Sequence, residues 1–480
     1  MAYVMTRLPR FRYQLGFQFF ISKKFPTNTL NPQHLTMAGA ADKARFYLEQ
    51  SVPELQEDLR KQIFTRDEIT SITKKRSDFE HILNARGSSP SDYARYVEYE
   101  MNLDSLRRKR VKRLGIRAPN HTGQRRIFSI LGRGTQKFQG DLGLWFTYLS
   151  FARQQKAYRK LEQILTQVLR LHPTKPQLWI YAARYAIEVQ ADIQGATTYM
   201  KRGVRFCQKS KEVYVEYAKV VMIDTARFEG RRRILGLDQD KVETYDDVEA
   251  EDMDADEIAL PSITAEDVNP DMRKGGTVDE EAPKKFVEQR VRVIMAIFQT
   301  AMKELNNNNP LTAEAFFDMF AQFPNISCTK RLLQHVLETM ETTSPTAVQT
   351  LSCSFRLPLI GVASSSPEFP SALGQCLERI KKALQQAPAS TEPIIKSAIL
   401  CLAPLARPAE DLDPAVEKVL KSSLRQYVKK LGSADKLARL MEGLQKDKRK
   451  EDAEVLLEIG NKAFGTEERL LALPVSVETP

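Results

Sequence analysis

The chain has 480 residues and a formal net charge of +11, from 72 Lys and Arg against 61 Asp and Glu. This balance indicates an anionic partner, and scarce strand signals beside long helical periods favour an all-α fold. The five cysteines lie far apart and predict neither a disulfide framework nor a zinc site, as expected in a reducing compartment. No apolar run approaches the roughly 18 residues that span a bilayer, so we expect a soluble, intracellular protein.

Residues 1–36 differ from the rest of the chain. They are basic, contain no acidic residue and are rich in Phe and Tyr. Two interpretations remain open: a mitochondrial presequence, or an extension upstream of a translation start at Met37. We favour the second, because everything after Met37 is self-consistent without it. Residues 1–36 are therefore predicted to be a disordered extension.

Residues 37–90 are predicted to form an N-terminal helical segment. A helix is expected from Asp42 to Ile63, kinked or split at Pro53. Thr65-Arg-Asp-Glu68 has the form of a capping box and opens the next helix, which Gly87-Ser-Ser-Pro90 ends. The apolar stripe of that helix consists of Ile69, Ile72, Phe79, Ile82 and Leu83.

An aromatic motif repeats within residues 91–236. The copy that begins at Trp145 recurs 34 residues later at Trp179 and 35 residues after that at Tyr214. Its bulky residues are three and six apart, so they share one side of a helix. Pro176 fits the first turn of the second copy's helix, where a missing N–H costs nothing. An aliphatic helix follows the first copy, with its stripe at Ala157, Leu161, Ile164, Leu165, Val168 and Leu169.

These helix pairs predict a right-handed α-solenoid, because neither helix of a pair can bury its apolar face alone. A further copy has Tyr93 in the Trp position, with Arg126–Leu131 in its partner helix. Glu100 ends this copy and is expected to form hydrogen bonds within the helix pair. We expect the motif residues to be structural: Tyr93, Tyr96, Tyr99, Glu100, Trp145, Tyr148, Phe151, Trp179, Tyr185, Tyr214 and Tyr217.

The repeat resembles the half-a-TPR (HAT) repeat, which is typical of RNA-processing assemblies. Ordinary TPR has a similar period, but the Leu-Gly of its first helix is absent from the copies at 145, 179 and 214. The N-terminal sequence is more specific. Four stretches resemble the U3 small nucleolar RNA-associated protein 6 family: Lys43-Ala-Arg-Phe-Tyr-Leu-Glu-Gln50, Phe64-Thr-Arg-Asp-Glu-Ile69, Lys74-Lys-Arg-Ser-Asp-Phe-Glu80, and Tyr96-Val-Glu-Tyr-Glu-Met-Asn-Leu103 followed by Arg107–Arg113.

That family is a HAT-repeat subunit of the small-subunit processome, and the resemblance covers roughly residues 41–235. It implies a nucleolar, non-enzymatic scaffold that acts in pre-18S rRNA processing and small ribosomal subunit biogenesis. The implied partners are other processome proteins, including helical-repeat and WD40-type subunits, and U3 snoRNA or pre-rRNA. Two alternatives remain open: a HAT scaffold of the splicing or mRNA 3′-end machinery, and a TPR-like co-chaperone adaptor that binds peptides.

The second half of the chain begins with an acidic stretch. Residues 237–284 are rich in Asp and Glu and bordered by Pro and Gly, so we expect a disordered insertion within one helix pair. Residues 285–465 are predicted to continue the helical repeats, and residues 466–480 form a tail. Further helices are expected at 311–322, 329–341, 372–386, 393–404, 413–430, 434–446 and 450–463.

No constellation of residues predicts catalysis. The chain has no phosphate-cradling Gly loop in a strand–loop–helix context and no metal spacing among its five histidines. His81 is expected to be partly buried on its helix, and Cys207 to be a small apolar core residue. We therefore predict that the protein is not an enzyme and has no cofactor, metal or small-molecule ligand.

Four basic runs remain as candidate phosphate contacts: 74–76, 107–113, 125–126 and 231–233. In the longest run, an apolar stripe of Leu103, Leu106, Val111 and Leu114 is expected to dock the helix. That docking would leave Arg107, Arg108, Lys109, Lys112 and Arg113 in solvent, where they are candidates for RNA contact. The protein's own acidic stretch is the competing anionic partner.

The acidic stretch leads to a prediction about proteolysis. Limited digestion should cut first between about residues 238 and 284, and the two fragments should stay associated through Tyr214–Arg233 against Phe286–Leu305. Sizing of the digested protein without denaturant tests this prediction. Fragments that separate in that experiment would refute an insertion within one helix pair.

Overall fold

The computed structural model describes residues 37–116, 121–234, 281–305, 309–407, 413–446 and 449–464. Every regular element in these ranges is a helix, so the predicted all-α class is confirmed. The predicted extension at 1–36, the acidic stretch up to residue 280 and the tail at 466–480 lie outside the described residues. The chain divides into two compact units, Met1–Leu161 and Glu162–Pro480, which are described separately.

The N-terminal unit begins with three helices near their predicted positions, although the first starts at Met37 and not at Asp42. The expected first helix is split into α1 (Met37–Glu49) and α2 (Val52–Arg60), with a proline in the first turn of α2. α3 (Arg66–Asn84) starts at the predicted capping box, because the Thr65 hydroxyl accepts from the Glu68 amide and the Glu68 carboxylate accepts from the Thr65 amide. The predicted stripe is wrong at Ile82, which is 46% exposed, and Arg76 and Glu80 are buried on the inner face instead.

The next helices of this unit are α4 (Pro90–Leu114), α5 (Thr122–Lys137), α6 (Leu142–Gln154) and the start of α7 (Tyr158–Leu171). α4 is one long helix that ends where Gly115 adopts a φ of +65°, a conformation that favours glycine. Gly134 lies inside α5, and a Cβ there would come within 2.6 Å of a Leu144 methyl and 2.8 Å of the Tyr93 ring. This glycine therefore costs helix propensity but lets α5 approach its neighbours closely.

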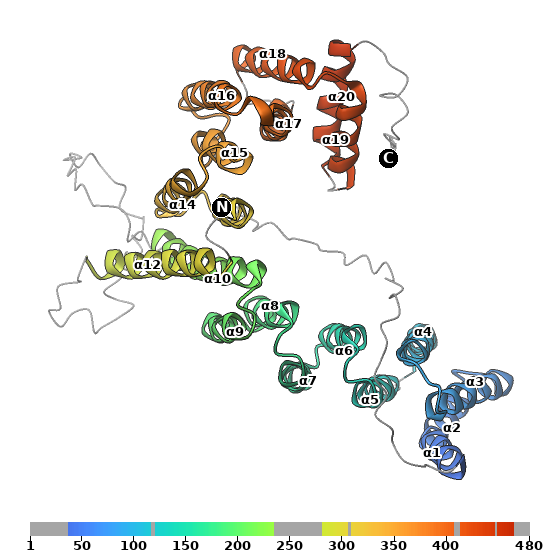
Figure 1. The fold of residues 1–480 in the computed structure, drawn as a ribbon. Helices are drawn as coiled ribbons and strands as arrows, with labels where there is room; N and C mark the ends of the chain where they lie inside the picture. The colour runs from blue at the N-terminus through green and yellow to red at the C-terminus, as the bar shows by residue number, and fades with distance from the viewer. Residues whose placement is uncertain are drawn as a thin grey trace, which may run out of the picture. The chain divides into compact units, whose positions relative to one another are not determined.

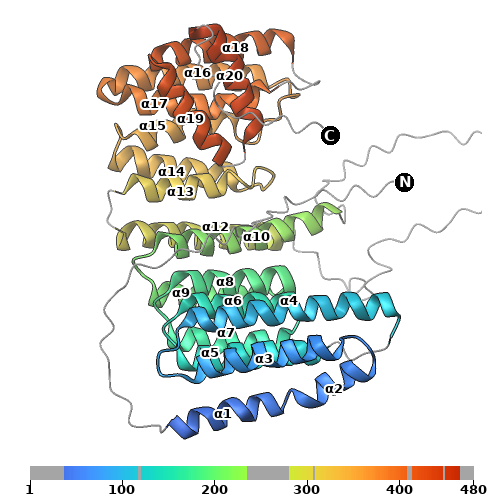
Figure 2. The ribbon, with the colours of Figure 1, turned by 90° about the vertical axis from the view of Figure 1, so that its right-hand side faces the viewer.

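The C-terminal unit continues the helix pairs. They are α8 (Pro176–Tyr185, prolonged by a π-helical segment to Gln190) with α9 (Ile193–Phe206), α10 (Lys211–Ile234) with α12 (Glu281–Glu304), α13 (Pro310–Phe320) with α14 (Thr329–Thr343), α15 (Val348–Arg356) with α16 (Phe369–Gln386), α17 (Thr391–Leu402) with α18 (Pro414–Leu431), and α19 (Ala434–Lys446) with α20 (Lys450–Phe464). The first helices α8, α10, α13, α15 and α17 each pack against the next, as Figures 1 and 2 show. The unit is therefore a stack of helix pairs.

One position recurs in the first helix of every pair. Its fourth residue is buried throughout: Tyr93, Trp145, Trp179, Tyr214, Ala313, Leu351, Ile394 and Leu437. After residue 310 the aromatic side chain is replaced by a smaller one, which is why the motif could not be followed there in the sequence. The sequence pattern does not predict α15, which is short and carries small polar residues such as Thr350, whose hydroxyl donates to the Ser344 carbonyl at 2.8 Å.

The two tryptophans are held in the same way. The indole N–H of Trp145 donates to the Gln139 carbonyl at 3.0 Å, and that of Trp179 to the Pro173 carbonyl at 2.7 Å. Each acceptor lies six residues earlier, in the loop before the helix. Both side chains are buried, at 3% and 4% exposure. Each therefore packs in the core and also fixes the preceding loop through its indole hydrogen bond.

The acidic stretch joins the described fold at two helix ends that lie together. α10 packs against α12 through Phe228 and Phe286, whose ring centroids are 4.3 Å apart. Arg290 forms an ion pair with Asp224 at 2.6 Å, one turn further along the same interface. The residues between Ile234 and Glu281 therefore leave and re-enter one helix pair.

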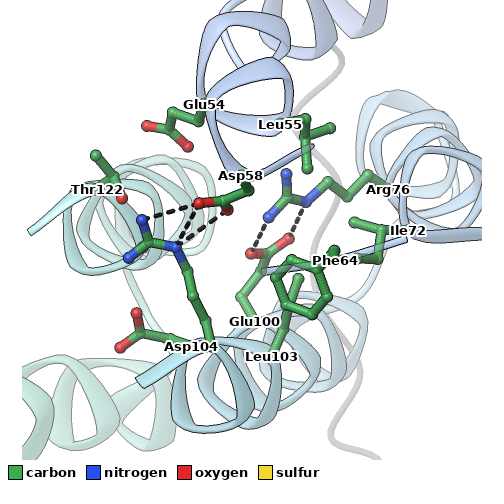
Figure 3. Close-up of a pocket in the computed structure, with 12 residues that line it drawn as sticks. Glu54, Leu55, Asp58, Phe64, Ile72, Arg76, Glu100, Leu103, Asp104 and Thr122 are labelled. Carbon is green, nitrogen blue, oxygen red and sulfur yellow. Dashed lines mark hydrogen bonds and ion pairs between the residues drawn. The ribbon is translucent and has the colours of Figure 1, made fainter. Parts of the chain in front are cut away.

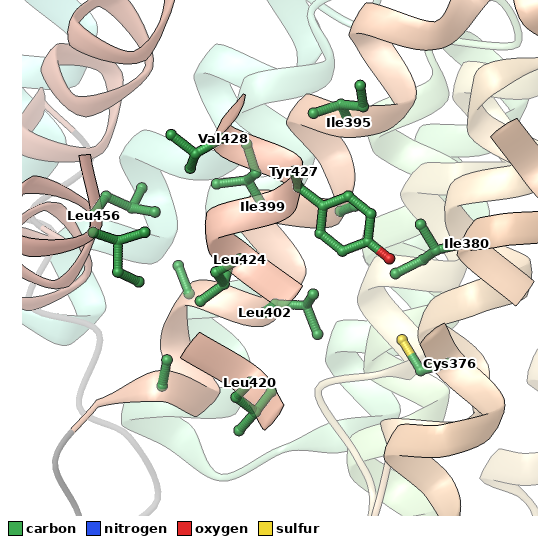
Figure 4. Close-up of a cluster of buried hydrophobic side chains, with 14 of the residues drawn as sticks. Cys376, Ile380, Ile395, Ile399, Leu402, Leu420, Leu424, Tyr427, Val428 and Leu456 are labelled. Carbon is green, nitrogen blue, oxygen red and sulfur yellow. The ribbon is translucent and has the colours of Figure 1, made fainter. Parts of the chain in front are cut away.

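The C-terminal end of the chain has a continuous apolar core. It joins α15–α20 and includes Ile380, Ile399, Leu424 and Leu456, several of which are drawn in Figure 4. Asp452 is completely buried at its edge, between Arg407 at 2.7 Å and Arg449 at 2.6 Å. Burial opposes ionisation of this carboxyl, but hydrogen bonds from both arginines keep its pKa below the ordinary value. The ion pairs thus connect α20 to the chain after α17.

The buried tryptophans lead to a stability prediction. Trp145→Ala and Trp179→Ala should each lower the free energy of unfolding by about 3–5 kcal/mol, as expected for a large buried aromatic side chain. Trp→Phe should cost less, because the ring volume is largely kept while the bond to the loop carbonyl is lost. Urea denaturation measures both effects, with the 43% exposed Tyr158→Ala as the control. Wild-type stability of both Trp→Ala variants would contradict a structural role.

Candidate nucleic-acid interface

The basic run of α4 does not lie wholly in solvent. Arg107 is only 7% exposed, and its Nε lies 3.0 Å and 3.1 Å from the two carboxylate oxygens of Asp58 on α2. The expectation that Leu106 and Leu114 dock the helix is wrong, since they are 42% and 45% exposed. Leu103 and Val111 of the same stripe do pack against an apolar cluster, and beside them Arg107 and Arg110 bind carboxylates on α2 and α3. Arg107 is therefore removed from the candidate RNA contacts.

Two further arginines of the run are bound internally. Arg108 forms an ion pair with Asp104 at 2.6 Å, one turn earlier on α4. Arg110, which is not among the predicted RNA contacts, donates to both carboxylate oxygens of Glu68 at 2.7 and 2.8 Å and lies over the Phe64 ring. The hydrogen bonds from Arg110 lower the pKa of Glu68 to about 2. These interactions join the C-terminal half of α4 to the start of α3.

The remaining cations of the run form one exposed group. Lys109, Lys112 and Arg113 are exposed and have no ion pair with the described residues. They are three and four residues apart on α4, so they lie on one face of the helix. Of the five predicted RNA-contacting residues, the structure therefore leaves three available to an external anion, with Arg108 partly exposed beside them.

A second buried ion pair lies beside Arg107. Arg76 on α3 donates from Nε and Nη2 to the two carboxylate oxygens of Glu100 on α4, at 2.7 and 2.8 Å (Figure 3). Both side chains are almost fully buried. Burial opposes the charge on Arg76, but the neighbouring Glu100 carboxylate outweighs it and raises the arginine's pKa. Glu100 thus forms hydrogen bonds between helices, and Arg76 is a core residue rather than a phosphate contact.

α5 completes this network. Arg126 donates to Glu54 on α2 at 2.7 Å and lies 3.9 Å from Glu100. Arg133 donates to both oxygens of Glu80 on α3 at 2.8 Å, and its guanidinium lies 3.8 Å from the centre of the Tyr47 ring. These arginine–carboxylate pairs were not predicted from the sequence. The signal that could have indicated them is the spacing of Ile72, Arg76, Glu80 and Leu83, which places two charged residues on the buried face of α3.

A small cavity separates the two ion pairs. Its volume is about 20 Å³, and Asp58, Arg76, Glu100, Asp104 and Arg107 are among the residues that line it (Figure 3). One guanidinium nitrogen of Arg76 and one carboxylate oxygen of Asp104 are buried here without a protein partner. A cavity of this size holds about one water. Burial raises the pKa of Asp104, because the negative carboxylate is poorly solvated at this site. A bridging water in the cavity would supply the missing hydrogen bonds.

The predicted motif residues lie where helices meet. Tyr93, Tyr96, Tyr148, Phe151, Tyr185, Tyr214 and Tyr217 are all buried, whereas Tyr99 is half-buried. Tyr96 stacks on Phe79 with ring centroids 4.9 Å apart, which joins α4 to α3. Burial raises the pKa of Tyr148 to about 12. Cys207 is buried, with its Sγ 3.5 Å from the Pro173 carbonyl oxygen.

The other basic runs present fewer free charges than their sequence indicates. Lys74 and Arg125 are exposed, and Lys75 lies 5.6 Å from the centre of the Tyr99 ring. Arg233 donates to the Asn325 carbonyl at 3.3 Å. The prediction for His81 is wrong: it is exposed, because the inner face of α3 at that turn is occupied by other residues.

Within the described ranges, no group of three or more His, Cys, Asp or Glu side chains is arranged to hold a metal ion. No helix in the same ranges is long and apolar enough to cross a membrane. The features that the structure does show are stacked helix pairs, a polar network inside the N-terminal unit and exposed lysines and arginines on its edge. These features define an all-helical protein built from stacked helix pairs.

Comparison with known proteins finds similarity in the N-terminal region. Residues 48–132 match the family model described as U3 small nucleolar RNA-associated protein 6, so the resemblance found in the sequence is confirmed. The Schizosaccharomyces pombe protein of that name is 34% identical over 236 residues, which cover 47% of this chain and 48% of that protein. The human homolog is 29% identical over 180 residues, or 37% of this chain and 30% of that protein.

The matched region thus spans less than half the length of these relatives. Among solved structures, the crystal structure of the APC/C hetero-tetramer Cut9-Hcn1 aligns with 91% of this chain and 72% of its own. Its sequence identity is 12% and its TM-score 0.23, values too low to support a conclusion.

The buried network leads to a second stability prediction. Glu100→Ala should lower the free energy of unfolding by about 3–5 kcal/mol, because it leaves Arg76 charged and buried without its partner. The double variant Arg76→Met, Glu100→Leu should recover most of that loss, since neither charge of this pair is then buried. Urea denaturation of the single and double variants measures the difference.

The matched control is Glu49→Ala, which removes the partner of the exposed Arg45 and should change stability by less than about 0.5 kcal/mol. A double variant less stable than Glu100→Ala would show that the ion pair contributes more to the free energy of unfolding than the desolvation of its two charges costs.

Proposed function

We propose that this protein is a non-enzymatic scaffold of the U3-containing small-subunit processome, acting in pre-18S rRNA processing in the nucleolus. Three findings support the proposal: the family match at residues 48–132, the relatives named for association with U3 small nucleolar RNA, and the stacked helix pairs. Stacked pairs of this kind form extended surfaces that hold several partners at once. The partners are other processome proteins and U3 snoRNA or pre-rRNA.

RNA contact is assigned to the α4 basic surface, which we define as Arg60, Arg66, Lys109, Lys112 and Arg113. The ion pair between Arg107 and Asp58 brings the end of α2, with exposed Arg60, beside this part of α4. The ion pair between Arg110 and Glu68 does the same for the start of α3, with exposed Arg66.

This assignment rests on the different environments of the cations within one basic run of α4. Arg107 and Arg110 neutralise internal carboxylates, whereas Lys109, Lys112 and Arg113 face solvent without an ion pair to the described residues. Asp67 is an exposed carboxylate in the first turn of α3. One negative charge against the five cations of the surface leaves an excess of positive charge. Such a surface binds phosphates with a salt-dependent affinity and little sequence specificity.

The triple variant Lys109→Gln, Lys112→Gln, Arg113→Gln tests this surface. It should weaken association with single-stranded RNA and reduce the slope of log K against log salt by about 0.7 for each phosphate that is no longer bound. The melting temperature should barely change, because these side chains are exposed. Fluorescence anisotropy over a salt series, with thermal unfolding in parallel, measures both quantities.

The control carries Lys330→Gln, Arg331→Gln and Lys418→Gln, three exposed cations of α14 and α18, and should keep the wild-type slope. An unchanged slope in the α4 triple variant would eliminate RNA contact at this surface and favour the acidic stretch as its partner. Co-purification of spliceosomal proteins or chaperones, without U3 RNA or processome proteins, would overturn the scaffold proposal itself.

A further inference from the structure

A second cationic edge lies in the C-terminal unit, at the end of α9. Phe206 is the last residue of this helix and is 54% exposed, although it is a large apolar side chain. One side of its ring is supported by Trp179, with centroids 5.8 Å apart and planes inclined by 9°. Trp179 is itself buried and bonded to the Pro173 carbonyl. The Phe206 ring is therefore held in place while much of it remains open to solvent.

Basic residues flank Phe206 in the sequence and in the loop that packs against the end of α9. Arg202 precedes Phe206 by one helical turn, so the two side chains are neighbours on α9, and Arg205 is adjacent in sequence. Lys209 follows in the turn before α10, and Lys211 is the first residue of α10. Lys175 lies in the α7–α8 loop, which contacts α9 because the Pro173 carbonyl accepts from both Trp179 and Cys207.

We define the α9 basic edge as Lys175, Arg202, Arg205, Phe206, Lys209 and Lys211. Its five cations are exposed, and none forms an ion pair with the residues that the structure describes. Glu212 is the exposed carboxylate closest to them in sequence.

We propose that the α9 basic edge binds single-stranded RNA, with Phe206 as a stacking platform for one base and the surrounding lysines and arginines as phosphate contacts. A supported, exposed aromatic ring among cations is the combination that single-stranded nucleic acids require. Duplex RNA presents no free base to the ring, so the site should distinguish the two forms. The inference deepens the proposed function and rests on it, since it adds a second RNA-binding surface to the same scaffold.

The acidic stretch of the chain is the competing occupant. It joins the fold at Ile234 and Glu281, the adjoining ends of α10 and α12. The α9 basic edge lies at the opposite end of α10, and a helix of 24 residues separates the two by about 35 Å. The open aromatic ring favours RNA, because an acidic protein segment offers no base to stack on it.

Phe206→Ala tests the stacking platform in the full-length chain. The affinity for a short single-stranded oligouridylate should fall by about 5- to 150-fold, the range found when a base loses its aromatic partner, with little change in the salt slope. Phe206→Tyr should keep most of the affinity, because it retains the ring. Affinity for a duplex of the same length should not depend on residue 206. Leu311→Ala, another exposed apolar residue at 52%, is the matched control.

Arg202→Gln with Lys209→Gln tests the phosphate-binding cations. The double variant should reduce the salt slope by about 0.7 for each phosphate that is released, whereas Lys330→Gln with Arg331→Gln should not. Thermal unfolding of every variant shows whether the fold is intact, and Phe206→Tyr keeps the test valid if Phe206→Ala is destabilised.

The outcomes separate this inference from the function on which it rests. If Phe206→Ala and the Arg202, Lys209 double variant bind single-stranded RNA as the wild type does, while the α4 triple variant fails to bind it, the α9 basic edge is not an RNA site and the scaffold proposal stands. If the wild-type chain binds no RNA and U3 RNA does not co-purify, both proposals fail. A crosslink between Lys209 and a carboxylate of residues 238–257 that RNA does not displace would also overturn the inference.

Discussion

The structure depends on one constraint: a single pair of amphipathic helices leaves an apolar face uncovered and must stack on the next pair. The buried fourth residue of each first helix meets this constraint throughout, from Tyr93 to Leu437. Where it is Trp145 or Trp179, the indole N–H also binds the preceding loop, so helix packing and loop position are coupled. The smaller Ala313 and Leu351 keep the burial without that bond, and the larger Phe316 and Phe355 on the same helices are buried as well.

In the N-terminal unit, buried ion pairs between helices add to the apolar packing. Arg76, Arg107 and Arg133 each bind a carboxylate on another helix, and Asp58, Glu80 and Glu100 are among the most buried polar residues of the chain. A buried ion pair adds little net stability compared with an apolar pair of similar size. Its geometry is demanding, however, because each bidentate ion pair accepts one arrangement of two helices. We therefore interpret the network as the feature that sets how α2, α3, α4 and α5 meet.

The same network determines which charges remain for partners. Within one basic run of α4, the arginines that face inward are neutralised, and Lys109, Lys112 and Arg113 remain for an external anion. The α9 basic edge arises differently, because the inner face of α9 is apolar, with Ala196, Met200 and Gly203 buried, and every cation is displaced to the outside. The two cationic surfaces belong to separate units, so each can be removed by substitution without the other.

Local pattern in the sequence determined the all-α class, the capping box at Thr65, the split at Pro53 and the aromatic repeat up to Tyr217, because each depends on residues close together in the chain. The resemblance of the N-terminal stretches to their family was also local. Only the tertiary structure decided that Arg107 is buried, because its partner Asp58 lies 49 residues away. Likewise α15 and the repeat register after residue 310 depend on packing between helices where the aromatic residues are absent, and the open face of Phe206 depends on its support by Trp179. Periodicity in a sequence identifies the face of a helix, but interactions between distant segments determine what that face meets.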